Sequence, residues 1–158
     1  RDMERDIDSY IENLTHTREQ LSSARQQADD MNELAHKDSL TGIRNRLAYD
    51  KEIIRLDNEL QDGKHEFGIA MVDLNFLKVI NDTYGHLEGD AALILFASAI
   101  KDSAGAYSGF AARYGGDEFV WAFRPETDVS VEPEEVVCGI QSNLTAMCKK
   151  EEKPYVFW

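Results

Sequence analysis

Long apolar runs and positive charge are both scarce in this sequence of 158 residues. No stretch approaches the about 20 consecutive apolar residues of a membrane-spanning helix, so we expect no membrane contact from this part of the chain. Lys and Arg number 17 against 30 Asp and Glu, a formal net charge of −13. Such an acidic chain repels polyphosphate surfaces, which excludes a general nucleic-acid-binding protein. A phosphorylated ligand would need a divalent cation or a dedicated local pocket.

Cysteine is also rare, with only Cys138 and Cys148. Both fall in one predicted helix, where a rise of 1.5 Å per residue separates them by about 15 Å, too far for a disulfide. We expect reduced core thiols and a cytoplasmic location. The sequence opens without a secretory leader, and residues 154–158 are typical of the start of a strand. We therefore expect a fragment of a longer protein, whose other parts can carry a membrane anchor.

Glycine and proline are absent from residues 1–36, and apolar residues recur there at seven-residue spacing over more than four heptads. This pattern predicts a long helix. The repeating positions are Ile7, Leu14, Leu21, Ala28 and Ala35 in one set and Tyr10, Thr17, Ala24 and Met31 in the other. We interpret residues 1–36 as a parallel coiled-coil stalk; the alternative is a solvated helix that packs on its own domain. Alanine and threonine at the seam make the coiled coil weak, which suits a connector that transmits a signal.

Residues 37–158 read as one domain, which begins with a turn at residues 38–42. The nearly continuous apolar run 67–73 is typical of a central strand buried on both faces. Gly115 and Gly116 predict the turn of a hairpin. Helices alternating with adjacent strands predict an α/β (α+β) fold, a mixed central sheet flanked by helices. The elements we expect are helices over 43–60, 91–103 and from Pro133, and strands over 67–73, 110–114 and 117–123.

Acidic residues follow two of these strands. Asp73 ends the strand 67–73, with Lys78 nearby, and Asp117 and Glu118 follow the hairpin glycines. Taken alone, Asp73 could cap a turn, and the other two could be solvated acids beside a tight turn. If the strands are neighbours, however, Asp73 and Asp117 converge. Convergent carboxylates are typical of a Mg²⁺ site that shares the ion with a phosphate.

Three segments stand out in order along the chain, namely residues 38–46, residues 73–90 and residues 113–119 (Arg-Tyr-Gly-Gly-Asp-Glu-Phe). They resemble the motifs of the GGDEF domain family, the diguanylate cyclases. The first is similar to the family's opening turn, the second to its nucleotide-binding stretch, and the third matches the name-giving motif. The resemblance implies condensation of two GTP molecules into cyclic di-GMP, with release of two pyrophosphates, on a sheet like that of nucleotidyl cyclases and the polymerase palm. It also implies a homodimer, joined by the stalk and controlled by an upstream sensor domain.

The resemblance assigns metal binding and catalysis to the acidic residues. Asp73, Asp117, Glu118 and the Leu74 carbonyl would hold two Mg²⁺ ions, for which Mn²⁺ is an alternative. Glu118 would either ligate the metal or accept the proton of the ribose 3′-hydroxyl, and both roles stay open. Lys78 would act on the phosphates during catalysis.

The remaining matched positions would bind GTP. The loop amides near Phe76 and Leu77 would hold the β- and γ-phosphates, and Gly115 and Gly116 would let the backbone approach the nucleotide. Asn81 and Asp90 would recognise the base, and His86 would lie on the nucleotide side. A carboxylate at Asp90 accepts from guanine N1–H and N2–H₂, which adenine does not offer together. Packing for His86 and a helix N-cap for Asp90 are the alternatives.

Some positions depart from the family's pattern. Asn75 stands where many members carry a second Asp, and Leu77 stands where many carry Phe. Residues 106–109 replace the Arg-x-x-Asp motif of the product-inhibition site, so we expect no feedback inhibition through it. The sequence also stops before the family's last strands, which leaves the activity of the fragment by itself open.

An active, GTP-specific cyclase is our leading hypothesis. The alternative is a catalytically silent module that binds GTP or serves as a dimerising scaffold. Silent members usually lose the carboxylates, whereas Asp73, Asp117 and Glu118 are all present here. A cyclase for another nucleotide is disfavoured by Asp90.

Overall fold

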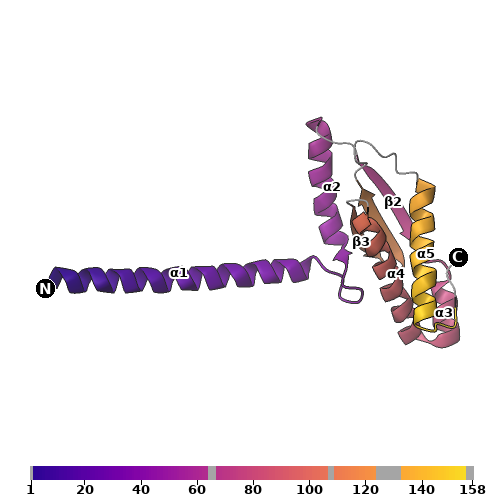
Figure 1. Cartoon of the computed structure of the whole chain (residues 1–158), viewed down its shortest axis with the longest axis horizontal. Helices are drawn as coiled ribbons and strands as arrows, with labels where there is room; N and C mark the ends of the chain where they lie inside the picture. Colours follow the sequence, from indigo (N-terminus) through magenta and orange to yellow (C-terminus); the bar gives the residue numbers. More distant parts are fainter. Residues whose placement is uncertain (1, 64–66, 107–108, 124–132, 156–158) are drawn as a thin grey trace. The chain divides into compact units, whose positions relative to one another are not determined.

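The chain forms two compact units, Arg1–His36 and Lys37–Trp158 (Figure 1). The structure is a computed structural model, and the residues that it describes are 2–63, 67–106, 109–123 and 133–155. The first unit consists of helix α1 (Asp2–Ala35), which confirms the predicted long N-terminal helix. Its seam residues Ile7, Leu14 and Leu21 are exposed. Within the described ranges, no helix is both long and apolar enough to cross a membrane.

The described residues of the second unit form a four-stranded mixed sheet, which confirms the predicted fold class. Its strands are β1 (Arg44–Asn45), β2 (Gly68–Asp73), β3 (Phe110–Gly115) and β4 (Glu118–Phe123), in the order β1-β3-β4-β2. β1 runs parallel to β3, whereas β4 pairs antiparallel with both β3 and β2. β4 therefore lies inside the sheet and brings the end of β2 beside the hairpin.

Helices cover the sheet on both faces (Figure 1). They are α2 (Arg46–Gln61), α3 (Leu77–Tyr84), α4 (His86–Ala106) and α5 (Pro133–Lys150). α4 and α5 pack side by side over one face, where Phe119 and Trp121 of β4 join the main core. α2 contacts β1 and β3 on the other face. Residues of β4 alternate between these two layers, so all of Phe119–Ala122 is buried.

The prediction that strand 67–73 is central and buried on both faces is wrong. Among the described residues β2 is an edge strand, and its Ile69 and Met71 side chains are 48% and 59% exposed. Gly68, Ala70 and Val72 alternate with them and are half-buried. The run 67–73 is apolar because both faces of β2 carry apolar side chains. One face packs on the core, whereas the other is not covered by α2.

Several predicted boundaries also need correction. Arg44 and Asn45 form the short strand β1, so α2 begins at Arg46 rather than near Ile43, with the Asn45 side chain accepting the Ala48 N–H. α4 begins at His86, which places Asp90 inside the helix and rules out the N-cap alternative. The short helix α3 was not expected. Cys148 is buried and Cys138 exposed, so only one of these two free thiols is in the core.

Two isoleucines of α4 test the assignment of the core. Ile100 is 1% exposed, whereas Ile94 is 41% exposed. Ile100→Ala should lower the free energy of unfolding by about 2–5 kcal/mol, because it leaves a cavity among packed side chains. The control Ile94→Ala should cost less than about 1 kcal/mol. Urea unfolding measures both, and equal losses would contradict the packing of α4 against the sheet.

Candidate active site

The acidic residues lie together at one end of the sheet. The antiparallel register of β2 and β4 places Asp73 opposite Glu118. Cross-strand partners of this kind share one face of a sheet, with their Cβ atoms about 5 Å apart. Asp117 lies in the adjoining turn, where its backbone carbonyl accepts the Leu74 N–H at 3.0 Å. The neighbouring strands thus bring Asp73 and the acidic residues of the hairpin to the same end of the sheet.

The hairpin turn is one residue further along the chain than predicted. The turn residues are Gly116 and Asp117, and Gly115 pairs with Glu118. The shift arises from an irregularity between Arg113 and Gly115 that leaves Tyr114 as an extra residue on β3. A type I′ turn needs positive φ at both turn residues, but only Gly116 has it, at 50°. The turn is therefore not a two-glycine type I′ turn.

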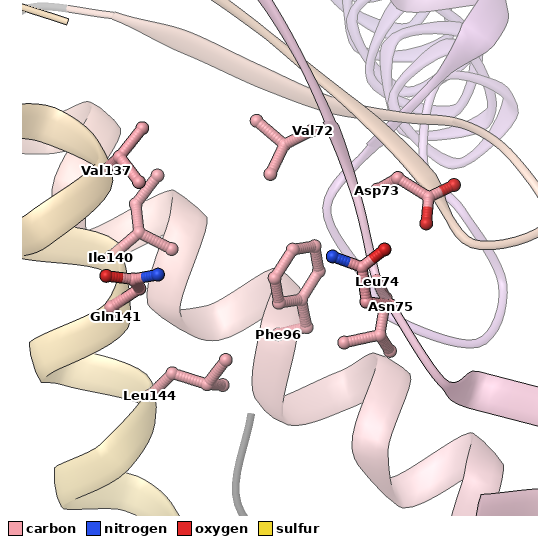
Figure 2. Close-up of a pocket in the computed structure, with 9 residues that line it drawn as sticks. All are labelled: Val72, Asp73, Leu74, Asn75, Phe96, Val137, Ile140, Gln141 and Leu144. Carbon is pink, nitrogen blue, oxygen red and sulfur yellow. The ribbon is translucent and has the colours of Figure 1, made fainter. Parts of the chain in front are cut away.

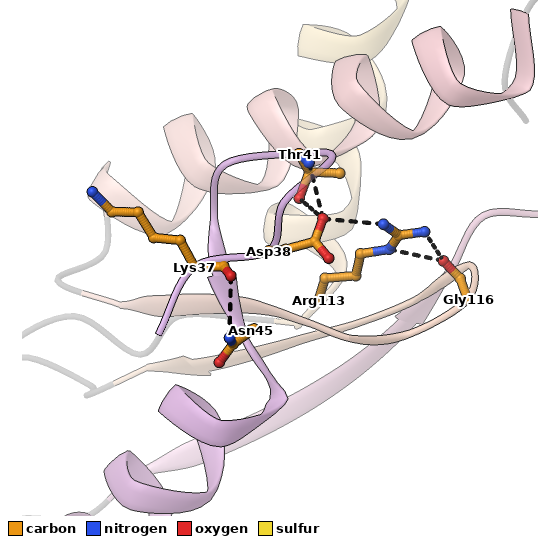
Figure 3. Close-up of polar contacts among 6 residues, drawn as sticks. All are labelled: Lys37, Asp38, Thr41, Asn45, Arg113 and Gly116. Atoms are coloured by element: carbon orange, nitrogen blue, oxygen red, sulfur yellow. Dashed lines mark hydrogen bonds and ion pairs between the residues drawn. The ribbon is translucent and has the colours of Figure 1, made fainter. Parts of the chain in front are cut away.

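Arg113 fixes the tip of this hairpin (Figure 3). Its guanidinium donates from Nε and Nη2 to the Gly116 carbonyl, at 2.9 and 2.7 Å. Its Nη1 donates to Asp38 Oδ1 at 3.0 Å. The same Asp38 oxygen accepts from the Thr41 N–H and hydroxyl, at 2.9 and 2.7 Å. Arg113 thus ties the hairpin tip to the turn at residues 38–42.

The charge on Asp38 stabilises this connection. Burial alone would raise the pKa of its carboxyl, but the hydrogen bonds from Thr41 and the Arg113 guanidinium together lower it below the ordinary value of 3.8. Stability from a carboxyl with a lowered pKa is complete above its unfolded-state value and is lost as the pH falls through the folded-state value. The network is therefore intact at neutral pH and is lost in acid.

Asp38→Asn should reduce the free energy of unfolding by about 1 kcal/mol at pH 7, because it removes the ion pair with Arg113 and keeps the side-chain size. The difference from the parent protein should shrink as the pH falls below 3.8, where the parent also loses the charge. Chemical unfolding at several pH values measures this. The control is Asp102→Asn, at an exposed position of α4. A difference for Asp38→Asn that does not change with pH would contradict the ion pair.

The loop between β2 and α3 presents backbone N–H groups. Leu77 and Lys78 begin α3, whose first N–H groups have no partner within the helix. Phe76 precedes them with a left-handed backbone at φ 67°, which is uncommon for a residue with a large side chain. Lys78 is exposed beside these amides. A helix N-terminus with an adjacent lysine suits a phosphate group.

An apolar cavity of about 160 Å³ lies at the same end of β2, between the sheet, α4 and α5 (Figure 2). Val72, Phe96, Ile140 and Leu144 are among its lining residues. Figure 2 shows the Asp73 carboxylate directed away from these side chains, as alternation along a strand requires. The cavity thus lies mainly on the core side of β2, and Asp73, which also lines it, directs its carboxylate away from it.

Comparison with known proteins identifies the family. The family model described as "Diguanylate cyclase, GGDEF domain" matches residues 35–156, more than half of the chain. The chain belongs to the GGDEF family. The Arg113-to-Phe119 segment, with the acidic end of β4 and the hairpin tip, is its GGDEF motif.

Individual relatives agree with this assignment. "Probable diguanylate cyclase DgcJ" of Escherichia coli K12 is 47% identical over 83 residues, which are 52% of this chain and 16% of that protein. "Diguanylate cyclase TpbB" of Pseudomonas aeruginosa is 33% identical over 91 residues, 58% of this chain and 21% of that protein. This chain thus spans about a fifth or less of these two curated relatives.

A solved structure shares the fold. The coiled coil and GGDEF domain of DgcB from Caulobacter crescentus, in complex with c-di-GMP, superposes with a TM-score of 0.70 at 30% identity. The match covers 85% of this chain and 68% of that one. It supports the mixed sheet preceded by a long helix.

The donor set of this GGDEF domain fits a magnesium ion shared with a substrate. Among the residues that the structure describes, no three His, Cys, Asp or Glu side chains gather closely enough to hold a metal by themselves. Asp73 and Glu118 nevertheless face each other across two strands. Mg²⁺ is usually held by one or two carboxylates together with substrate phosphates, rather than by a complete protein cage. The carboxylates here suit that arrangement.

The residues predicted to read the base lie on α3 and α4 of the GGDEF domain. Asn81 is half-buried on α3, whereas His86 and Asp90 are exposed in the first turns of α4. Asn81 packs directly on Gly89, because a Cβ at Gly89 would overlap the Asn81 amide oxygen and lie 2.8 Å from its Cγ. Gly89 therefore determines where the Asn81 side chain can sit.

Arg113, Asp38 and Gly89 have structural roles that the sequence did not predict. All three lie in the matched motifs, but nothing in the spacing of Asp38 and Arg113 indicates that they pair. Gly89 in an otherwise helical pattern is the one available signal of a close approach.

Gly89→Ala should raise the KM for GTP about tenfold, because the new methyl group displaces the amide predicted to bind guanine. Gly139→Ala is the matched control: Gly139 also lies in a helix, and a Cβ there would meet nothing within 4 Å. Alanine favours a helix over glycine by about 1 kcal/mol, so Gly139→Ala should keep the parent KM and should not lower the stability. Steady-state kinetics and thermal unfolding measure both variants. An unchanged KM in Gly89→Ala would contradict the role of the Asn81–Gly89 contact.

Proposed function

We propose that this GGDEF domain is a diguanylate cyclase, which condenses two GTP molecules into cyclic di-GMP and two pyrophosphates. The observation that carries the proposal is the placement of Asp73 opposite Glu118, with Asp117 bonded through its carbonyl to Leu74. Acidic residues at one end of the sheet, beside the N-terminus of α3, suit a triphosphate with its metal.

Each residue has a role that its position supports. Asp73, Asp117, Glu118 and the Leu74 carbonyl would hold two Mg²⁺ ions. When bound, Mg²⁺ neutralises the triphosphate and lowers the pKa of the ribose 3′-hydroxyl. Lys78 would neutralise the β- and γ-phosphates, which the amides near Phe76 and Leu77 also contact.

The base and the reacting atoms are positioned by the remaining residues. Asn81 and Asp90 would bind the guanine edge, with His86 on the nucleotide side, and Gly115 and Gly116 would leave space for the nucleotide. The 3′-oxygen of one GTP attacks the α-phosphorus of the other, and the bond to pyrophosphate breaks as the new ester bond forms. Glu118 accepts the hydroxyl proton or ligates the metal.

The reaction needs two GTP molecules facing each other, so we propose that α1 dimerises the protein as a coiled coil. Its exposed apolar residues at heptad spacing support this, as does the coiled coil of the DgcB relative. A sensor domain elsewhere in the protein would act through this helix, and the cytoplasm would supply GTP. If analytical ultracentrifugation finds the protein monomeric at high concentration, the proposed coiled-coil dimer is contradicted.

Asp73→Asn and Glu118→Gln should each lower kcat at least about 100-fold, because they remove charge that acts on the transition state. Both residues are exposed, so the thermal unfolding temperature should stay near that of the parent protein. Asp57→Asn, at an exposed position of α2, is the control. The assay incubates the full chain with GTP and Mg²⁺ and separates the nucleotides, with ATP and metal-free controls. Tight GTP binding without product in the parent protein would favour the alternative, a silent GTP-binding or dimerising module.

A further inference from the structure

Glu88 connects the first turn of α4 to the segment that follows α5. Its Oε1 accepts from Lys153 Nζ at 2.7 Å and from the Tyr155 hydroxyl at 3.0 Å. The Lys153 and Glu88 side chains are only 14% and 29% exposed, so this ion pair is partly shielded from water. We call these three residues the Glu88 clasp. Side chains that lie 65 and 67 residues apart in the sequence thus meet at one point.

The clasp holds both sides of the corner between α3 and α4. Glu88 belongs to α4, and the Tyr155 ring packs on Tyr84 at the end of α3, with centroids 5.9 Å apart. Gly85 lies between the two helices with φ 91°. Tyr155 therefore contacts Tyr84 before Gly85 and Glu88 after it. A movement of α3 relative to α4 about Gly85 would have to break one of these two contacts.

The segment that carries Lys153 is itself fixed to α5. The Lys153 N–H donates to the Cys148 carbonyl at 3.0 Å, and Glu152 N–H donates to the Lys149 carbonyl at 3.3 Å. Cys148 is buried in the main core. The clasp therefore joins the corner to the rigid part of the domain.

The protonation states suit such a connection at neutral pH. Hydrogen bonds from Lys153 and Tyr155 lower the pKa of the Glu88 carboxyl. Burial, together with the bond to Glu88, raises the pKa of the Tyr155 hydroxyl well above its ordinary value. The carboxylate is therefore charged and receives two donors, which makes the contact stronger than a neutral hydrogen bond.

The corner carries the residues assigned to the base. Glu88 lies between His86 and Asp90 in the sequence, and it directly precedes Gly89, on which Asn81 packs. A shift of the first turn of α4 would move Asp90 and displace Asn81 together. The position of the first turn of α4 relative to α3 is therefore critical for the recognition of guanine.

We propose that Glu88 is a positioning residue for guanine recognition, held in place by Lys153 and Tyr155 so that Asn81 and Asp90 keep their relative placement. This inference rests on the proposed function, since it concerns the base-binding part of the same site. It makes residues 151–155, which follow α5, a determinant of GTP affinity.

Glu88→Gln should raise the KM for GTP about fivefold while kcat changes less than about twofold, because a partly shielded ion pair is lost and the reacting groups are untouched. Glu88→Lys places two cations together and should raise the KM further. The exchange Glu88→Lys with Lys153→Glu restores opposite charges and should return the KM to within about twofold of the parent value. Tyr155→Phe keeps the ring on Tyr84 and should have a smaller effect than Glu88→Gln.

The control is Glu52→Gln, which removes an ion pair with Arg55 on the surface of α2. It should leave both kinetic constants unchanged. A merely structural role for Glu88 would lower stability and leave the KM unchanged, or would lower kcat as much as it raises the KM. Either result, or failure of the charge exchange to restore the KM, would overturn the proposal.

Titration calorimetry with a non-reacting GTP analogue and Mg²⁺ separates this inference from the proposed function. If the parent protein binds the analogue but makes no cyclic di-GMP, cyclase activity is refuted, and the dissociation constants of the variants still test the clasp. If the parent protein is active and Glu88→Gln binds the analogue with unchanged affinity, the clasp is refuted and the cyclase stands. If the parent protein does not bind the analogue, both are refuted.

Discussion

The pairing of β4 with strands on both of its sides is the constraint on which the rest of the domain depends. Phe119–Ala122 is buried throughout, with alternate residues packed in two different layers. A slip of one residue would exchange these layers, so the register of β4 is tightly specified. Glu118 directly precedes this stretch in the same strand, and its position opposite Asp73 therefore follows from core packing. The acidic end of the sheet is placed by apolar residues that take no part in chemistry.

The elements predicted well from sequence are those with a strong local pattern. α1 shows an unbroken heptad spacing, α5 starts at a proline and buries Ile140 and Leu144, and the hairpin strands surround a pair of glycines. The predicted convergence of Asp73 and Asp117 depended on the assumption that β2 and β4 are neighbours. The sheet order confirms that these two strands are neighbours.

The missed features depend on contacts between distant segments. β1 has only two residues, too short for any periodicity, and it forms because β3 is available to pair with Arg44 and Asn45. The irregularity at Tyr114 shifts the turn by one residue, which two consecutive glycines could not indicate. β2 looked central because an edge strand with an uncovered apolar face has the same composition as a buried one. The partners of Glu88 lie 65 and 67 residues away and leave no local signal.

The connection between Asp38 and Arg113 also bears on how the domain folds. The two residues are separated by 75 positions, whereas Arg113 and Gly116 are separated by three. Closing a long loop costs more entropy than closing a short one, so contacts distant in sequence form late in folding. The β3–β4 hairpin can pair early as a local element, but its tip is bound to the turn at residues 38–42 only after the intervening helices and β2 have assembled. A partly folded chain therefore contains every residue of the GGDEF motif and still lacks the geometry of the site.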